Sequence, residues 1–102
     1  MSTNLPDVKQ QITEMNGNLQ EQLWLHENLQ KAVQNFLSDP KYGDSDMKAV
    51  REYVTALSDT YLTSMIDLLK TRIDANIKYL ETVMKAMKVH GKKTAAQAAF
   101  LS

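Results

Sequence analysis

The amino-acid sequence predicts an all-α protein, an antiparallel hairpin of two long helices over residues 6–37 and 45–90. The first observation is a pair of apolar stripes with helical spacing, one on each side of a turn-forming segment. The second is that residues 44–90 contain neither glycine nor proline, the residues that most disfavour a helix interior. The third is a length of 102 residues without cysteine, which gives a modest core and no disulfide bonds. We therefore expect residues 1–102 to form a single helical domain.

The first helix is expected to begin near Pro6, because proline fits a first turn and the acidic Asp7 suits the positive end of the helix dipole. Its stripe alternates steps of three and four residues over more than four heptads, as in a coiled coil. The stripe positions are Leu5, Val8, Ile12, Met15, Leu19, Gln22, His26, Leu29, Val33 and Phe36. Eight of these ten side chains are apolar, so we expect this stripe to pack against the second helix.

A turn is expected over residues 38–45. Pro40 lacks a backbone donor and disfavours helix in the residue before it, and Gly43 accepts a positive φ. Beyond the turn, Asp44 or Ser45 can cap the second helix. A short turn between two amphipathic helices predicts that they run antiparallel.

The second helix carries its own stripe, and its steps lengthen to four residues over 61–77. The stripe positions are Met47, Val50, Val54, Leu57, Tyr61, Met65, Leu69, Ile73, Ile77, Leu80, Met84 and Met87. Four-residue steps rotate a stripe around the helix, as a coiled-coil stutter does. Should this helix break, the best place is between Ser58 and Thr60.

The C-terminal end of the second helix is expected to extend beyond the first. With the pivot at residues 41 and 42, residue i lies opposite residue 83 − i, so Leu5 lies opposite residue 78 or so. The side chains left without cover are Leu80, Val83, Met84 and Met87. Gly91 is a candidate helix stop, and residues 91–102 form either a flexible tail or a fold-back with a short helix at 94–101. The other possible cover is a second chain.

The charges are balanced over the whole chain, with 12 basic and 12 acidic residues, which gives no electrostatic case for nucleic-acid binding. Their distribution is uneven. Residues 1–46 hold seven acids against three lysines, a net charge of −4, which residues 47–102 compensate with +4. Opposite charges on the two arms favour antiparallel pairing, although each exposed pair contributes only a few tenths of a kcal/mol.

Two segments are the candidate interaction surfaces. Leu23, Trp24 and Leu25 are three consecutive large apolar residues, which point in different directions around a helix and cannot all enter a two-helix seam. At least one therefore contacts a third element; the alternative is that Trp24 simply covers the flank of its own hairpin. The overhang of the second helix is the other segment, and it adds Lys85 and Lys88 around its apolar residues. The partner-binding set is therefore Leu23, Trp24, Leu25, Leu80, Val83, Met84, Met87, Lys85 and Lys88.

The sequence holds no catalytic, cofactor or metal motif, and we predict a protein that is not an enzyme. His26 sits on the apolar stripe, where a lone histidine usually serves as a polar core residue that fixes the register. An enzyme would need a pocket that joins His26, Tyr61 and nearby polar groups, and a narrow bundle leaves little room for one. A Glu-x-x-His pair, which would indicate a di-metal bundle, does not occur.

Residues 76–93 form a basic amphipathic helix that could dock in an acidic groove or lie on an anionic membrane. Glu81 interrupts the basic surface and the apolar residues are medium-sized, so we favour an ordinary core helix with a solvated face over either kind of docking. The sequence has no signal-peptide pattern and no long apolar run, which favours the cytoplasm, although export by a route without a signal peptide would leave the same sequence.

In outline, a cysteine-free helical hairpin of this length with Lys41, Tyr42 and Gly43 in its turn resembles the WXG100-type secreted proteins, without their Trp-x-Gly motif. Asp39 and Pro40 followed by a long amphipathic helix are similar to needle and inner-rod subunits of type III secretion. We predict a helical interaction protein, an adaptor, small chaperone-like protein or assembly subunit that packs against itself or a protein partner. The resemblances imply the alternative, a secreted or structural component of a bacterial secretion or filament system.

Overall fold

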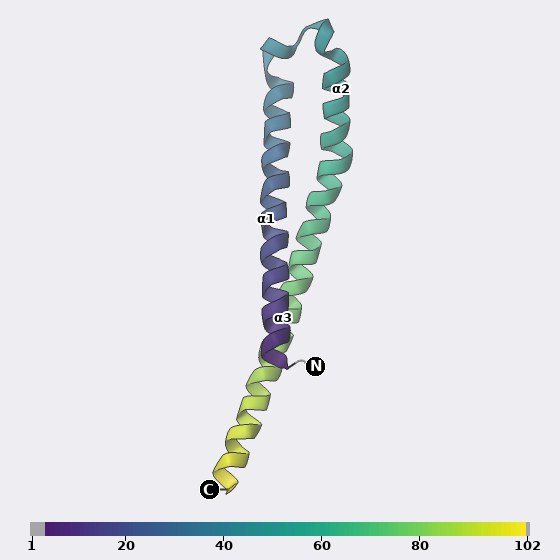
Figure 1. Ribbon diagram of the computed structural model, residues 1–102. Helices are drawn as coiled ribbons and strands as arrows, with labels where there is room; N and C mark the ends of the chain where they lie inside the picture. The colour runs from purple at the N-terminus through teal and green to yellow at the C-terminus, as the bar shows by residue number, and fades with distance from the viewer. Residues whose placement is uncertain (1–3, 102) are drawn as a thin grey trace. The chain divides into compact units, whose positions relative to one another are not determined.

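The computed structural model describes the backbone of residues 4–101 and the side chains of residues 4–92. All regular structure in this part of the chain is helical, which confirms the prediction of an all-α protein. In chain order, the elements are α1 (Leu5–Ser38), two short 3₁₀ turns (Pro40–Tyr42 and Ser45–Met47), α2 (Lys48–Ala56), a π-helical segment (Leu57–Leu62) and α3 (Thr63–Leu101) (Figure 1).

Helix α1 begins one residue earlier than predicted because Asn4 caps it. The Asn4 side-chain oxygen accepts a hydrogen bond from the backbone N–H of Asp7 at 3.0 Å, and its carbonyl accepts one from Val8 at 3.1 Å. An asparagine cap satisfies donors that the first turn of a helix leaves unpaired. At the other end, the Ser38 hydroxyl donates to the carbonyl of Gln34 at 2.9 Å.

The turn between α1 and α2 covers residues 39–47 and is longer at its C-terminal side than predicted. Asp39 caps the first 3₁₀ turn by accepting a hydrogen bond from the backbone N–H of Lys41 at 2.9 Å. Gly43 adopts φ −85° and ψ −1°, so the expectation of a positive φ is wrong. What favours glycine here is space, because a Cβ at this position would lie 3.3 Å from the carbonyl oxygen of Pro40.

Where we expected a possible break, at Ser58–Thr60, the chain stays helical and forms the π-helical segment Leu57–Leu62. The carbonyl of Ser58 accepts hydrogen bonds from the backbone N–H of Thr63 and from its hydroxyl, the latter at 3.0 Å. This five-residue spacing takes up one more residue than an α-helical turn. The irregularity therefore shifts the stripe by one residue without interrupting the helix.

Helix α3 does not stop at Gly91 but continues to Leu101, so the predicted helix stop is wrong and residues 94–101 do not form a separate short helix. Gly91 does not adopt a positive φ, which a left-handed helix-ending glycine would require. The strong helix formers that follow, lysine, alanine and glutamine, offset the cost of about 1 kcal/mol for one glycine. The side chains of residues 93–101 lie outside the described part of the structure.

The chain divides into two compact units, one made of Met1–Asn18 with Ile73–Ser102 and the other of Leu19–Arg72. In the Leu19–Arg72 unit, side chains before and after the turn meet directly. The Gln30 amide donates to the Thr63 hydroxyl at 3.4 Å, and the rings of His26 and Tyr61 lie 6.3 Å apart. The buried apolar side chains of this unit are Val33, Leu62, Ile66 and Leu69.

In the other unit, the start of α1 lies beside the later part of α3. Leu5 and Val8 line a cleft of about 500 Å³ together with Met87 and His90. The predicted register, which places Leu5 opposite residue 78, is therefore wrong. The longer turn and the additional residue of the π-helical segment both move the pairing toward higher residue numbers, and they account for only part of this shift.

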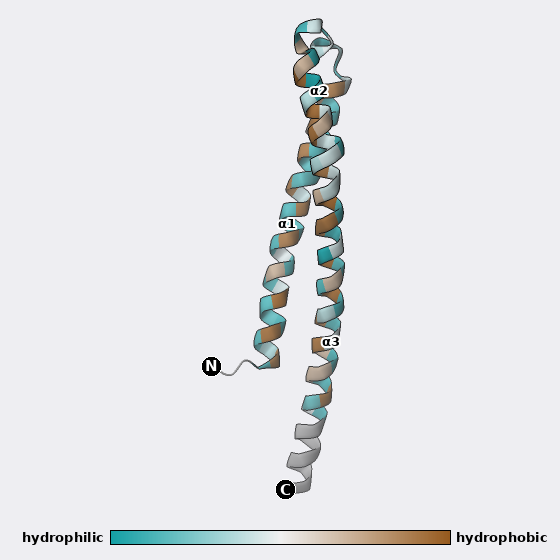
Figure 2. Ribbon diagram, turned by 90° about the vertical axis from the view of Figure 1, so that its right-hand side faces the viewer, coloured by the Kyte–Doolittle hydropathy of each residue, from teal (hydrophilic) through white to brown (hydrophobic). Residues whose placement is uncertain are grey.

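The stripes that are buried differ by one position from the predicted ones at several points. Asn16 is buried and Met15 is 51% exposed; likewise Leu62 is fully buried and Tyr61 is 52% exposed. From Leu62, the last residue of the π-helical segment, into α3, the buried and half-buried stripe reads Leu62, Ile66, Leu69, Ile73, Asn76, Leu80, Val83 and Met87. Figure 2 shows apolar and polar residues interspersed along both α1 and α3, so the hydropathy pattern by itself left two neighbouring stripes to choose from.

Candidate functional site

The candidate site of the Leu19–Arg72 unit is a set of large apolar side chains that its own core leaves exposed. They are Trp24, Leu25, Leu29, Val50, Tyr53, Tyr61 and Leu68, with exposed fractions between 41% and 72%. Leu23, by contrast, is half buried. The predicted cluster at residues 23–25 is thus divided: Leu23 turns toward the core, while Trp24 (62% exposed) and Leu25 (52%) remain at the surface.

Six of these seven residues share a position in the helical repeat. Each directly precedes a residue that is buried, half buried or bonded across the turn: the pairs are Leu25 and His26, Leu29 and Gln30, Val50 and Arg51, Tyr53 and Val54, Tyr61 and Leu62, Leu68 and Leu69. Successive residues of an α-helix are rotated by about 100°. The six therefore lie to one side of the packed stripe, in the same rotational sense on both arms. Trp24 follows Leu23 and lies to the other side.

The charge pattern distinguishes these two sides. Among the helical positions of the Leu19–Arg72 unit that precede an inward (buried or half-buried) residue, the first acid, lysine or arginine is Arg72, at the end of the unit; Lys41 and Asp46, which also precede half-buried residues, lie in the turn. Positions that follow an inward residue include several charged side chains among uncharged ones, and we call this the charged side: Glu27, Lys31, Glu52, Asp59, Asp67 and Lys70. The sequence analysis missed this difference because it merged the two stripes into one.

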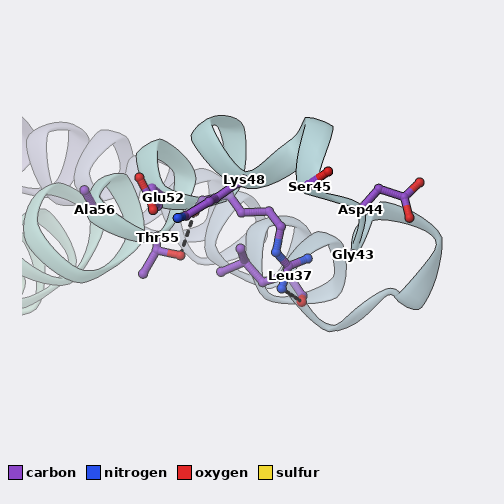
Figure 3. Close-up of a pocket in the computed structure, with 9 residues that line it drawn as sticks. Leu37, Gly43, Asp44, Ser45, Lys48, Glu52, Thr55 and Ala56 are labelled. Carbon is purple, nitrogen blue, oxygen red and sulfur yellow. Dashed lines mark hydrogen bonds between the residues drawn. The ribbon is translucent and has the colours of Figure 1, made fainter.

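A cleft of about 550 Å³ opens beside the turn, on the charged side, and is lined by Leu37, Lys48, Arg51, Glu52 and Thr55 among others (Figure 3). The Arg51 guanidinium spans the turn: it donates to the carbonyl of Leu37 at 2.8 Å and to that of Tyr42 at 3.3 Å. These bonds satisfy a carbonyl that the end of α1 would leave unpaired. We therefore assign Arg51 a structural role, and its hydrogen bonds leave the cleft without a free guanidinium.

The predicted overhang residues lie in the other unit. Leu80, Val83 and Met87 are half buried, Met84 is 52% exposed, and both lysines of the set, Lys85 and Lys88, are exposed. Met84, Met87 and these lysines line a cleft of about 470 Å³ with Lys9 of α1. The apolar side of this segment thus faces α1, and the predicted role of its residues in partner binding stays a prediction.

His26 is half buried and held by its own helix, because its Nδ1–H donates to the carbonyl of Gln22 at 2.7 Å. The neighbouring Tyr61 is 52% exposed, so the two rings meet at the surface. Among the described residues, no group of three or more His, Asp or Glu side chains is arranged to hold a metal ion.

Comparisons with protein-family models, with curated proteins and with solved structures found no match to this chain. Within the part of the chain that the structure describes, none of the helices combines the length and the apolar character needed to cross a membrane.

Proposed function

We propose that this protein is a non-enzymatic helical interaction protein that acts by packing its helices against itself or a protein partner, as an adaptor, small chaperone-like protein or assembly subunit. We further propose that the two arms run antiparallel along their length and that such hairpins combine into a helical bundle. The side-chain contacts across the turn, from Arg51 to Leu37 and from Gln30 to Thr63, support the hairpin.

The observation that carries the proposal is the position of the six exposed apolar residues. On two antiparallel helices, positions with the same rotational offset from the packed stripe lie on the same side of the pair. Leu25, Leu29, Val50, Tyr53, Tyr61 and Leu68 then form one continuous surface, which we call the neutral face. Its members are 41–72% exposed.

A surface of this kind is costly for a chain that remains alone in water. Six large side chains that are each about half exposed present on the order of 600 Å² of surface. Contiguous apolar patches above a few hundred Å² are uncommon on monomeric proteins and indicate interaction sites. Aromatic side chains such as Tyr53 and Tyr61 are also enriched at interfaces.

The surroundings of His26 offer little support for the alternative of catalysis. The Nδ1–H of His26 is engaged by a backbone carbonyl, and its aromatic neighbour Tyr61 is at the surface. A general base needs a reacting group held within hydrogen-bond distance, for which an enclosed pocket is the usual means.

The proposal is tested by site-specific photo-cross-linking in cells of the source organism. A photoreactive phenylalanine analogue replaces Leu25 or Leu68 on the neutral face, and Glu52 or Lys70 on the charged side as matched controls. We expect adducts with a protein, either this chain or another, from the two neutral-face positions only. The absence of any adduct from Leu25 and Leu68, or equal labelling from all four positions, would contradict the proposed function.

A further inference from the structure

We propose that the neutral face is occupied by the neutral face of a second copy of this chain, so that two hairpins form a four-helix bundle. This inference rests on the proposed function and goes further, because it names the partner. The charge pattern, the size of the surface and its position on the two arms each favour a second copy.

The charge pattern favours a neutral partner. Between Gln22 and Leu68, the other helical positions of the same offset hold no acid, lysine or arginine; they include Gln22, Ala32, Phe36, Leu57 and Met65. A partner with a charged surface would have to bury those charges without opposite charges to pair with, which is costly. The neutral face itself has no such charge to bury, so it can pack against the neutral face of a second copy without this cost.

The size of the neutral face also suits a second copy. On the order of 600 Å² per chain approaches the about 800 Å² per partner of a standard protein interface. In a two-fold symmetric pair, the same patch supplies both sides, so the neutral face of each chain covers that of the other. Four helices packed in this way have the architecture of a four-helix bundle, with the present core and the new interface as its two layers of contacts.

Trp24 makes the proposal specific. A tryptophan that is 62% exposed is the residue most often expected to anchor an interface. It lies on the charged side, however, about 100° around α1 from its neighbour Leu25. The proposed dimer therefore depends on Leu25 and leaves Trp24 uninvolved, so two adjacent residues provide the matched pair for the test.

The test is sedimentation equilibrium of the full-length chain, wild type and variants, over a range of concentrations. The molar mass measured for the wild type is expected to be twice the chain mass of 11.6 kDa. Leu25→Lys and Tyr53→Lys are each expected to raise the dimer dissociation constant by at least about 30-fold, whereas Trp24→Lys should change it by less than about 3-fold. Tyr53 is 72% exposed, so its replacement should leave the helical content of the monomer, measured by circular dichroism, unchanged.

A wild type that sediments as one chain at all concentrations would overturn the proposal. So would an assembly that persists in Leu25→Lys and Tyr53→Lys, or one that only Trp24→Lys dissociates. If Leu25→Lys loses helical content, Tyr53→Lys alone decides the result. A monomeric wild type that still gives photo-adducts with a different protein from Leu25 and Leu68 would refute the second copy and retain the proposed interaction function.

Discussion

Two asparagines occupy inward positions of the unit formed by residues 1–18 and 73–102. Asn16 is 7% exposed and Asn76 is 8% exposed. The side-chain oxygen of Asn16 and the side-chain nitrogen of Asn76 are buried without a hydrogen-bond partner among the described residues. A buried polar group without a partner lowers stability by about 1–3 kcal/mol, and a single asparagine in an apolar seam is known to fix register at such a cost. We infer that these two asparagines lower the stability of the fold and at the same time favour one defined pairing of the arms.

Replacing both residues by leucine, in Asn16→Leu/Asn76→Leu, should raise the free energy of unfolding by about 1–3 kcal/mol, because the unpaired amides are replaced by apolar side chains. The measurement is denaturant unfolding followed by circular dichroism. As a control, Asn18→Leu places the same change at an exposed position and should have a smaller effect. A double variant that is less stable than wild type would contradict this account and indicate that the amides are satisfied in solution.

These asparagines also show what the sequence could not predict. The helical spacing of α1 identified an inward face correctly at Leu5, Val8, Ile12, Leu19 and Val33, but it placed Met15 inside because methionine is the more apolar of two neighbours. Burial is decided by where the partner helix lies, and this depends on the length of the turn and on the π-helical segment. Neither can be derived from hydropathy, so the burial of Asn16 could not be predicted.

At the scale of elements, the ends and irregularities of the helices depend on specific hydrogen bonds. Arg51 of α2 is the clearest case, since it reaches from one arm to the last turn of the other and bonds the carbonyls of Leu37 and Tyr42. Sequence patterns identified the turn through Pro40 and its neighbours but not this contact. Arg51 lies 14 residues after Leu37, whose carbonyl accepts its hydrogen bond, and local sequence patterns do not predict a contact over that separation.

Arg51→Ala should lower the free energy of unfolding by about 1.5–3 kcal/mol, the range for a hydrogen bond with a charged donor whose loss leaves a carbonyl unpaired. Arg51→Lys should recover only part of this loss, because an ammonium group lacks the planar fork that reaches two carbonyls. Thermal unfolding of both variants is compared with that of Lys48→Ala, an exposed neighbour on α2. Equal melting temperatures for Arg51→Ala and Lys48→Ala would show that the contact contributes nothing.

The π-helical segment Leu57–Leu62 is the second such feature. Inward residues around it, Val54, Ser58, Leu62 and Ile66, are spaced by four residues throughout, one more per heptad than a regular seam requires. The segment takes up the additional residue, as π-bulges do. The sequence placed the four-residue steps later, over 61–77, where the inward residues in fact alternate steps of four and three, so the position of the predicted rotation is wrong.

Deletion of Asp59, which is exposed within the segment, should convert it to regular α-helix and leave the melting temperature within a few degrees of wild type. The matched control is deletion of Thr71, an exposed residue of the regular helix α3, which rotates all following side chains by about 100° and should lower the melting temperature by more than about 10 °C. Similar losses in both deletions would mean that the π-helical segment does not hold an additional residue.

At the scale of the whole molecule, the register of the proposed hairpin can be tested directly, that is, which residue of one arm lies beside which residue of the other. The sequence alone paired residue i with residue 83 − i, which places Lys9 opposite Asp74. The clefts of the Met1–Asn18 and Ile73–Ser102 unit place Lys9 beside Lys88 instead. Residues 74 and 88 are 14 positions apart on α3, or about 21 Å along a helix. The two registers therefore differ by a distance that spin labels resolve easily.

The chain contains no cysteine, so pairs of cysteines introduced at exposed positions provide unique labelling sites. We expect electron–electron distance measurements to give a short separation in Lys9→Cys/Lys88→Cys and one larger by about 13–15 Å in Lys9→Cys/Asp74→Cys, because α1 and α3 run side by side in this unit. All three residues are exposed, so the labels should leave the packed stripes intact. Samples diluted with unlabelled protein keep distances between chains out of the measurement. The reverse order of the two distances would restore the shorter register, and two long distances would show that the arms do not pair.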